Sequence, residues 1–152
     1  MKATGEIMGI GSNLEEALLK GVRSLEIGAN HLHLPKFDNM SVDELLEYIK
    51  EFRSDNIFAI AELLYHGVSI EKIHEITMIT PYFLEVFKNI IDMEEQLRVR
   101  KDAEILTAAK KMGFGDKYIA RMWKCEEIDV SVPAEYDKEF IVDKNNIFGI
   151  NF

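Results

Sequence analysis

Apolar residues recur every three or four positions through most of the chain, which is the spacing of a helix with one buried face. The first run follows Asn13, a residue type that favours the N-terminal cap of a helix. The run ends before Gly28, and its apolar members are Leu14, Leu18, Val22 and Leu25. The pattern predicts a first helix over about residues 14–26.

Cap residues mark further helices. Ser41 and Glu44 have the spacing of a capping box, in which each side chain binds a backbone amide that is otherwise free. Pro81 after Thr80 suits a first helical turn, because proline lacks only an amide that has no partner there. Gly67 stands where a left-handed C-terminal cap is expected. These positions and the apolar periodicity predict helices over about 41–52, 54–66, 69–76, 81–98, 102–112 and 116–123.

The remaining segments lack this periodicity. Residues 6–10 suggest a short extended piece, residues 29–40 a loop, and residues 126–152 a loop or poorly ordered tail. We therefore expect an all-α fold, a single compact bundle of five to seven short helices with an irregular C-terminal tail. The expected division is a helical domain over 1–123 and a divergent tail over 124–152.

The composition agrees with one globular domain. The chain has 152 residues and a mass of 17.5 kDa, with 47% hydrophobic and 30% charged residues. Its single cysteine, Cys125, excludes an internal disulfide framework and a cysteine-rich zinc site, and it fits a reducing compartment. No apolar stretch reaches the roughly 20 residues of a membrane span. We expect a soluble, cytoplasmic protein with no membrane partner.

Charge is unevenly distributed along the chain. The formal net charge is −9, yet residues 98–124 carry eight bases and three acids. Two predicted helices, joined by a Gly-Phe-Gly turn, have the length of a helix-turn-helix, so DNA binding through residues 102–124 stays open as an alternative. We expect no nucleic-acid partner, because Ile119 and Trp123 have core spacing and the acidic remainder of the chain repels a duplex.

The segment from Gly9 to Ser12 offers a second alternative. Glycines before a helix can let backbone amides approach a phosphate at the helix N-terminus. The third glycine of the Gly-x-Gly-x-x-Gly pattern and the lysine of a phosphate loop are both missing. A tight turn is the favoured interpretation, and small-nucleotide binding stays open.

Four histidines are candidates for metal binding. His31 and His33 form a His-x-His pair, which is a possible half of a metal site. Acidic or thiol partners do not cluster near them in sequence. We therefore favour histidines on the surface or at helix ends, and the same interpretation applies to His66 and His74.

No other residues form a catalytic pattern. Adjacent acids such as Glu94 and Glu95 point about 100° apart on a helix, so a solvated face explains them better than a shared proton. Cys125 lacks the sequence surroundings of a nucleophile and is expected to be a bystander thiol. Because no cluster of convergent ionisable groups emerges, we expect no catalytic, cofactor-binding or metal-binding residue in this chain.

Seven strings of residues, taken in order, carry a resemblance to a known family. They are Gly5-Glu6-Ile7-Met8-Gly9-Ile10-Gly11, Glu15-Glu16-Ala17-Leu18-Leu19-Lys20, Arg23-Ser24-Leu25-Glu26-Ile27-Gly28, Arg53-Ser54-Asp55-Asn56-Ile57-Phe58-Ala59-Ile60-Ala61-Glu62, Ser69-Ile70-Glu71-Lys72-Ile73-His74-Glu75-Ile76-Thr77, Ile79-Thr80-Pro81-Tyr82-Phe83-Leu84 and Lys110-Lys111-Met112-Gly113-Phe114-Gly115-Asp116-Lys117-Tyr118-Ile119-Ala120. Together they resemble the helical oligomerisation domain of the carbamoyl-phosphate synthase large subunit. The resemblance covers about residues 2–123, and we expect the chain to depart from the family after Trp123.

The resemblance implies a non-catalytic helical spacer between the two ATP-grasp halves of a glutamine-dependent ligase. That enzyme makes carbamoyl phosphate for pyrimidine or arginine biosynthesis from bicarbonate, glutamine-derived ammonia and ATP. It also implies that ATP and magnesium bind the flanking halves and not this domain. The implied partners are a second copy of the chain, the flanking ATP-grasp halves and the glutaminase small subunit.

Self-association requires an exposed apolar surface. The first predicted helix precedes the main helical body, so we take Leu18, Val22 and Leu25 as interface candidates. The alternative is that these three residues belong to the internal core, as large aliphatic side chains commonly do.

Overall fold

The computed structural model describes residues 8–25, 31–125 and 130. These residues form seven α-helices and one short 3-10 helix, with no β-strand among them. The expected all-α bundle of five to seven helices is confirmed. The helices are α1 (Leu14–Arg23), α2 (Val42–Tyr48), α3 (Asn56–Tyr65), α4 (Ile70–Thr77), α5 (Pro81–Val99), α6 (Ala103–Lys111) and α7 (Asp116–Trp123), and the 3-10 helix is η1 (Pro35–Phe37).

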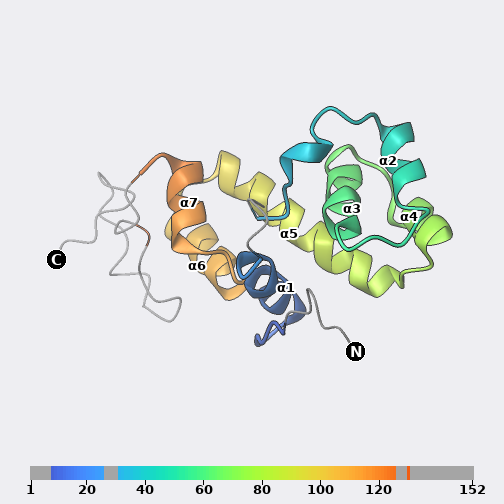
Figure 1. Ribbon diagram of the computed structural model, residues 1–152. Coiled ribbons are helices and arrows are strands. Elements are labelled where there is room, and N and C mark those ends of the chain that lie inside the picture. The colour runs from blue at the N-terminus through green and yellow to red at the C-terminus, as the bar shows by residue number, and fades with distance from the viewer. Residues whose placement is uncertain (1–7, 26–30, 126–129, 131–152) are drawn as a thin grey trace.

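The 19-residue helix α5 organises the fold. It runs through the middle of the molecule, with α2, α3 and α4 around one end and α6 and α7 around the other (Figure 1). It contacts α1, α3, α4, α6 and α7. At 1.5 Å per residue α5 is about 28 Å long, so one continuous element reaches both ends of the bundle.

Helix starts are fixed by side chains that are neighbours in sequence. Asn13 Oδ1 accepts a hydrogen bond from the Glu16 amide at 2.8 Å, so Asn13 caps α1 as predicted. The predicted capping box is present at α2. There Ser41 Oγ accepts from the Glu44 amide at 3.2 Å, and the Glu44 carboxylate accepts from the Ser41 amide at 2.7 Å.

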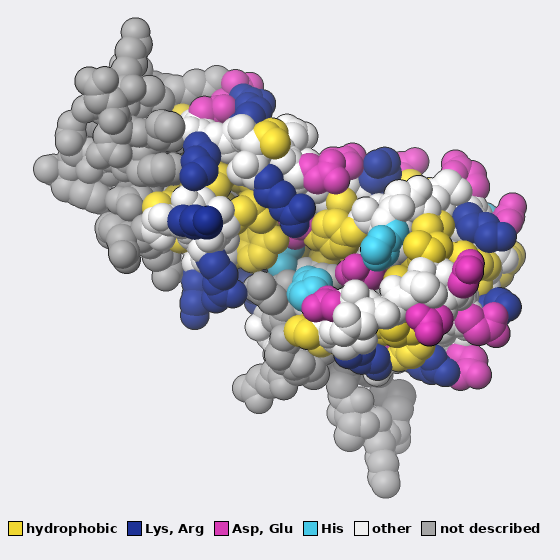
Figure 2. Space-filling model, turned by 90° about the horizontal axis from the view of Figure 1, so that it is seen from above, with side chains coloured by type: hydrophobic (Ala, Val, Ile, Leu, Met, Phe, Trp, Pro, Cys, Tyr) yellow, Lys and Arg dark blue, Asp and Glu magenta, His cyan; other side chains and the backbone are white. Residues whose placement is uncertain are grey.

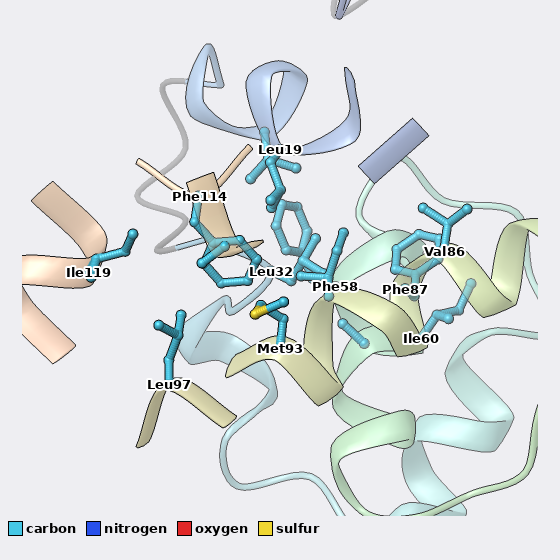
Figure 3. Packing of buried hydrophobic residues seen from close by; sticks show 14 of the residues in the cluster. Leu19, Leu32, Phe58, Ile60, Val86, Phe87, Met93, Leu97, Phe114 and Ile119 are labelled. Atoms are coloured by element: carbon cyan, nitrogen blue, oxygen red, sulfur yellow. The ribbon is translucent and has the colours of Figure 1, made fainter. Parts of the chain in front are cut away.

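One hydrophobic core extends along α5. Ile90 and Leu97 of α5 have no exposed surface. Leu19 of α1, Phe58 of α3 and Phe114 of the α6–α7 turn belong to the same cluster (Figure 3). Because the two ends of the bundle share this core, they form one packed body.

Helix α2 ends earlier than predicted. It stops at Tyr48, whereas the sequence suggested a helix through about residue 52. Ile49 is the C-terminal cap of α2, and its side chain is buried in the core. The helix therefore ends at the position where this apolar side chain packs inward. The Arg53 guanidinium then lies 4.1 Å from the centre of the Tyr48 ring, which holds the turn closed.

Three further local predictions differ from the structure. Helix α1 ends at Arg23, whereas the sequence suggested a helix through about residue 26. Residues 8–10 belong to no strand, and residues 6–7 lie outside the described residues. Pro81 begins α5 as predicted, but the Thr80 side chain makes no capping hydrogen bond. The predicted tail lies outside the described part of the chain except for residues 124, 125 and 130.

In the described part of the chain, no helix combines the length and the apolar character needed to cross a membrane.

Candidate functional site

A shallow groove lies between α1 and the start of α3, and we call it the α1 groove. Its volume is about 270 Å³. The α1 residues on it recur at helical spacing, so they form one face of that helix. The groove is lined by Gly9, Ala17, Leu18, Gly21, Val22, Leu25, Ser54 and Ile57.

The three interface candidates occupy different depths of this groove. Val22 is 3% exposed and belongs to the core, so its side chain offers almost no surface to a partner. Leu18 and Leu25 are half-buried, packed against the core on one side and facing the groove on the other. Whether any of the three contacts a second copy stays a prediction.

Sequence reasoning missed the most exposed apolar side chains beside this groove. Met8 is 85% exposed and Ile10 is 73% exposed, and they flank the groove residue Gly9. Leu14 is also exposed and stands four residues before Leu18 on the same helix face. The sequence did contain a sign of this exposure. Met8 and Ile10 stand on either side of Gly9, in a segment for which no helix was predicted.

A second exposed apolar patch lies at the junction of α4 and α5. It consists of Met78, Tyr82 and Phe83, and the rings of Tyr82 and Phe83 meet edge to face at 5.9 Å. Met78 has a φ of +60°, a left-handed conformation that costs a non-glycine residue free energy. The patch is therefore an alternative contact surface.

The Gly9–Ser12 segment packs against α1 and does not present a free anion cradle. A Cβ on Gly9 would lie 2.0 Å from the Ala17 carbonyl oxygen, so the glycine permits a close backbone approach. The Ser12 amide and hydroxyl both donate to the Glu16 carboxylate, at 2.6 and 2.7 Å. Because this carboxylate already takes the position of an anion at the start of α1, the structure favours the turn interpretation over nucleotide binding.

The predicted location at the surface or at a helix end is confirmed for three histidines and is wrong for His31. His33 and His66 are partly exposed, and His74 lies in the last turn of α4, where its Nδ1 binds the Ile79 carbonyl oxygen. His31, in contrast, is 8% exposed and has a φ of +61°. Its ring contacts those of Phe114 and Tyr118, whose centres are 4.7 and 4.1 Å away, and it stacks on the Tyr118 ring.

Glu94 is the acceptor that holds His31 in the interior. Glu94 is 1% exposed, and its Oε1 lies 2.5 Å from His31 Nδ1. Since a carboxylate only accepts, His31 donates from Nδ1. Tyr118 donates to the same oxygen at 2.8 Å, and Tyr65 donates to Oε2. The expectations that Glu94 faces solvent and that no ionisable groups converge are therefore both wrong.

Burial has an electrostatic consequence in this cluster. Burial and the neighbouring Glu94 charge raise the pKa of the Tyr118 hydroxyl well above its ordinary value. Tyr118 therefore stays a hydrogen-bond donor at neutral pH. The cluster ties α3, α5, α7 and the segment before η1 together, which explains it without any catalytic role.

The basic helices α6 and α7 also serve the core. Ile119 and Trp123 are buried, as their spacing predicted, and Trp123 Nε1 donates to the Leu97 carbonyl oxygen at 2.8 Å. Lys and Arg side chains gather toward the α6–α7 end (Figure 2), where Lys110 pairs with Asp116 at 2.9 Å. The buried positions account for the pattern that suggested a helix-turn-helix.

Comparison with protein families decides what this helical body is. The model of the family described as "Carbamoyl-phosphate synthetase large chain, oligomerisation domain" matches residues 6–136, which is most of the chain. The chain belongs to this family. The carbamoyl-phosphate synthetase match confirms the resemblance found in the sequence. It runs to residue 136, so the expected departure from the family after Trp123 is wrong. The division of the chain at residue 123 stays a prediction.

Proposed function

We propose that this chain is a non-catalytic helical domain through which large chains of a carbamoyl-phosphate synthetase associate. The observation that carries the proposal is the family match over residues 6–136. The same domain would keep the catalytic parts of the enzyme at a fixed separation. The continuous helix α5, which contacts five other helices, supports this spacer role because it resists bending between the two ends of the bundle.

We place the contact between copies on the face of α1. Exposed Met8 and Ile10 flank the groove residue Gly9, and exposed Leu14 stands one helical turn before the groove residue Leu18. Apolar and weakly hydrated side chains suit the buried centre of an interface. In a two-fold arrangement, α1 of one copy would meet the same face of α1 in the second copy. Each apolar residue of this face would then be buried in both copies.

The parent reaction is part of the proposal. We infer that the parent is a glutamine-dependent ligase that forms carbamoyl phosphate from bicarbonate, glutamine-derived ammonia and ATP. ATP and magnesium would bind ATP-grasp halves on either side of this domain, and a glutaminase subunit would supply ammonia. The enzyme would act in the cytoplasm, in pyrimidine or arginine biosynthesis.

Solution mass tests the association. The chain should show a mass that is a multiple of 17.5 kDa in size-exclusion chromatography with light scattering, and the mass should fall on dilution. Leu14→Asp should return it to a single copy, because a charge then stands at the centre of the contact. An acidic residue in the first turn of α1 favours the helix, so the fold should survive.

Tyr82→Ser is the matched control. It removes an exposed side chain of the other apolar patch, and it should leave the mass unchanged. If Tyr82→Ser dissociates the oligomer and Leu14→Asp does not, the contact lies at the α4–α5 junction. A mass of 17.5 kDa at high concentration would overturn the association itself.

Ligand titrations test the two alternatives. Calorimetry with ATP and magnesium should give no saturable heat, and saturation at one site would favour a nucleotide-binding domain. A DNA duplex should not bind at physiological salt, and affinity that falls steeply with salt would favour a role for the basic helices.

A further inference from the structure

The ligands that His33 lacks in sequence are supplied by the fold. His33 Nε2 lies 2.6 Å from Asp38 Oδ1, just after η1, and Glu62 of α3 approaches the same point. One ligand atom from each of these three residues lies within 4.8 Å of the other two. Two ligands of a tetrahedral zinc ion, each about 2.1 Å from the metal, are about 3.4 Å apart. The spacing therefore needs only small side-chain movements to match such an ion.

The donor types favour zinc. One imidazole with two carboxylates suits zinc, and the imidazole distinguishes this set from a calcium or magnesium site. His66, the C-terminal cap of α3, has its Nε2 3.3 Å from Glu62 Oε1 and so lies beside the group. Figure 2 shows histidine and acidic side chains side by side on this face of the molecule.

The charges around these residues favour a cation. Asp38 and Glu62 pair with His33 and His66, and neither carboxylate has a lysine or arginine within ion-pair distance in the part of the chain that the structure describes. A divalent ion between the two carboxylates would supply an opposing charge.

There is also space for an ion with bound water. His33 and Glu62 line a pocket of about 380 Å³, whereas a water molecule occupies about 30 Å³. The buried carboxylate of Glu94 lines the same pocket and adds to its negative potential, while Arg98 at the wall opposes it. Tyr65 and Tyr118 complete the lining.

We propose that His33, Asp38 and Glu62 bind one divalent zinc-type ion, with water completing its coordination. Binding would tie the segment around η1 to α3. The site is distinct from the α1 groove, and it does not depend on the proposed association.

Calorimetry on the complete chain, first freed of metal with a chelator, tests the site. Zinc chloride at pH 7.5 should bind with one ion per chain and raise the melting temperature. Cobalt(II) should compete and give the visible absorption of a tetrahedral complex.

Variants then locate the site. His33→Ala and Asp38→Asn should each weaken zinc binding at least about tenfold and remove the cobalt absorption. Both side chains are more than 40% exposed, so circular dichroism should show an unchanged fold, and the second variant remains informative if the first does not fold. Glu47→Gln, which changes an exposed acid of α2, is the control and should bind like the parent chain.

Two results would overturn the proposal. One is the absence of saturable binding to the complete chain. The other is undiminished affinity in both His33→Ala and Asp38→Asn, which would place the ion on other residues.

Discussion

Single residues account for the strongest links between distant parts of this chain. Glu94 accepts hydrogen bonds from His31, Tyr65 and Tyr118, which lie between 24 and 63 residues away along the chain. A buried carboxylate is costly unless such partners surround it. Glu94 therefore stabilises the fold only as a member of the complete set.

Removing the Glu94 carboxylate should strongly destabilise the fold. Glu94→Ala leaves one imidazole and two hydroxyls without their buried acceptor, and we expect a loss of about 3–5 kcal/mol in the free energy of unfolding. Urea denaturation measures this loss. The adjacent Glu95→Ala, on the exposed side of α5, should change stability by no more than about 0.5 kcal/mol. Equal effects of the two variants would contradict the role of the cluster.

Glu16 should make the free energy of unfolding depend on pH in the acidic range. Hydrogen bonds from Lys20 and then from Ser12 lower the pKa of Glu16 from 4.5 to about 2. A carboxyl group with a lowered pKa in the folded state stabilises the fold above its unfolded value and loses that contribution as pH falls through the folded value. The stability difference between the parent chain and Glu16→Gln should therefore be present at pH 6 and shrink between pH 4.5 and pH 2. A difference that stays constant over this range would contradict the assignment.

Sequence reasoning reaches some of these residues and not others. Asn13 and Ser41 bind amides three residues away, so their roles follow from local spacing. His31 and Glu94 are 63 residues apart, and no pattern along the chain pairs them. Glu62 approaches His33 for the same reason, because two separate elements fold against each other.

At the scale of helices, starts are more predictable than ends. The seven helices begin within one or two residues of the predicted positions, because caps are local. The early end of α2 depends on the burial of Ile49, which is a tertiary effect. Gly67, after α3, has a φ of +80° and confirms the predicted left-handed position.

Two glycines after helices should respond differently to a methyl group. Gly67 has open space around it, so Gly67→Ala should cost only the left-handed strain, about 1 kcal/mol. Gly113 has a φ of +100°, and its new Cβ would lie 2.6 Å from Glu16 Cα, so Gly113→Ala should cost about 2–4 kcal/mol. Thermal or urea unfolding of both variants checks the order. A smaller loss at Gly113 would show that α1 can shift away freely.

At the scale of the whole molecule, α5 joins both ends of one core. The short stretches of sequence that match the family in order indicated the family from the sequence alone. The match of the family model confirms that inference. The positions of the exposed apolar surfaces were harder to predict from the sequence. Val22, predicted as an interface candidate, is buried, while Met8 and Ile10 are exposed. Periodicity predicts which face of a helix is apolar, but not how much of that face the rest of the fold covers.

The shared core predicts cooperative unfolding. Trp123 is the only tryptophan and lies buried at the α6–α7 end, so its fluorescence reports on that end. Far-ultraviolet circular dichroism reports on all helices, including α2, α3 and α4. The two urea transitions should coincide at equal protein concentration. Separate midpoints would show that the two ends of the bundle unfold independently.

The contacts of α1 have a consequence for shortened versions of the protein. Asn13 Nδ2 donates to the Lys111 carbonyl oxygen at 3.0 Å, and Arg23 donates to that of Gly113 at 2.6 Å. The Lys111 carbonyl ends α6 and the Gly113 carbonyl lies in the turn after it, so α1 caps the end of a helix that stands much later in the chain. Helix α1 is therefore part of the structural core of the domain. A truncation that begins after residue 31 would deprive α6 of both donors, and expression screens should retain residues 8–25.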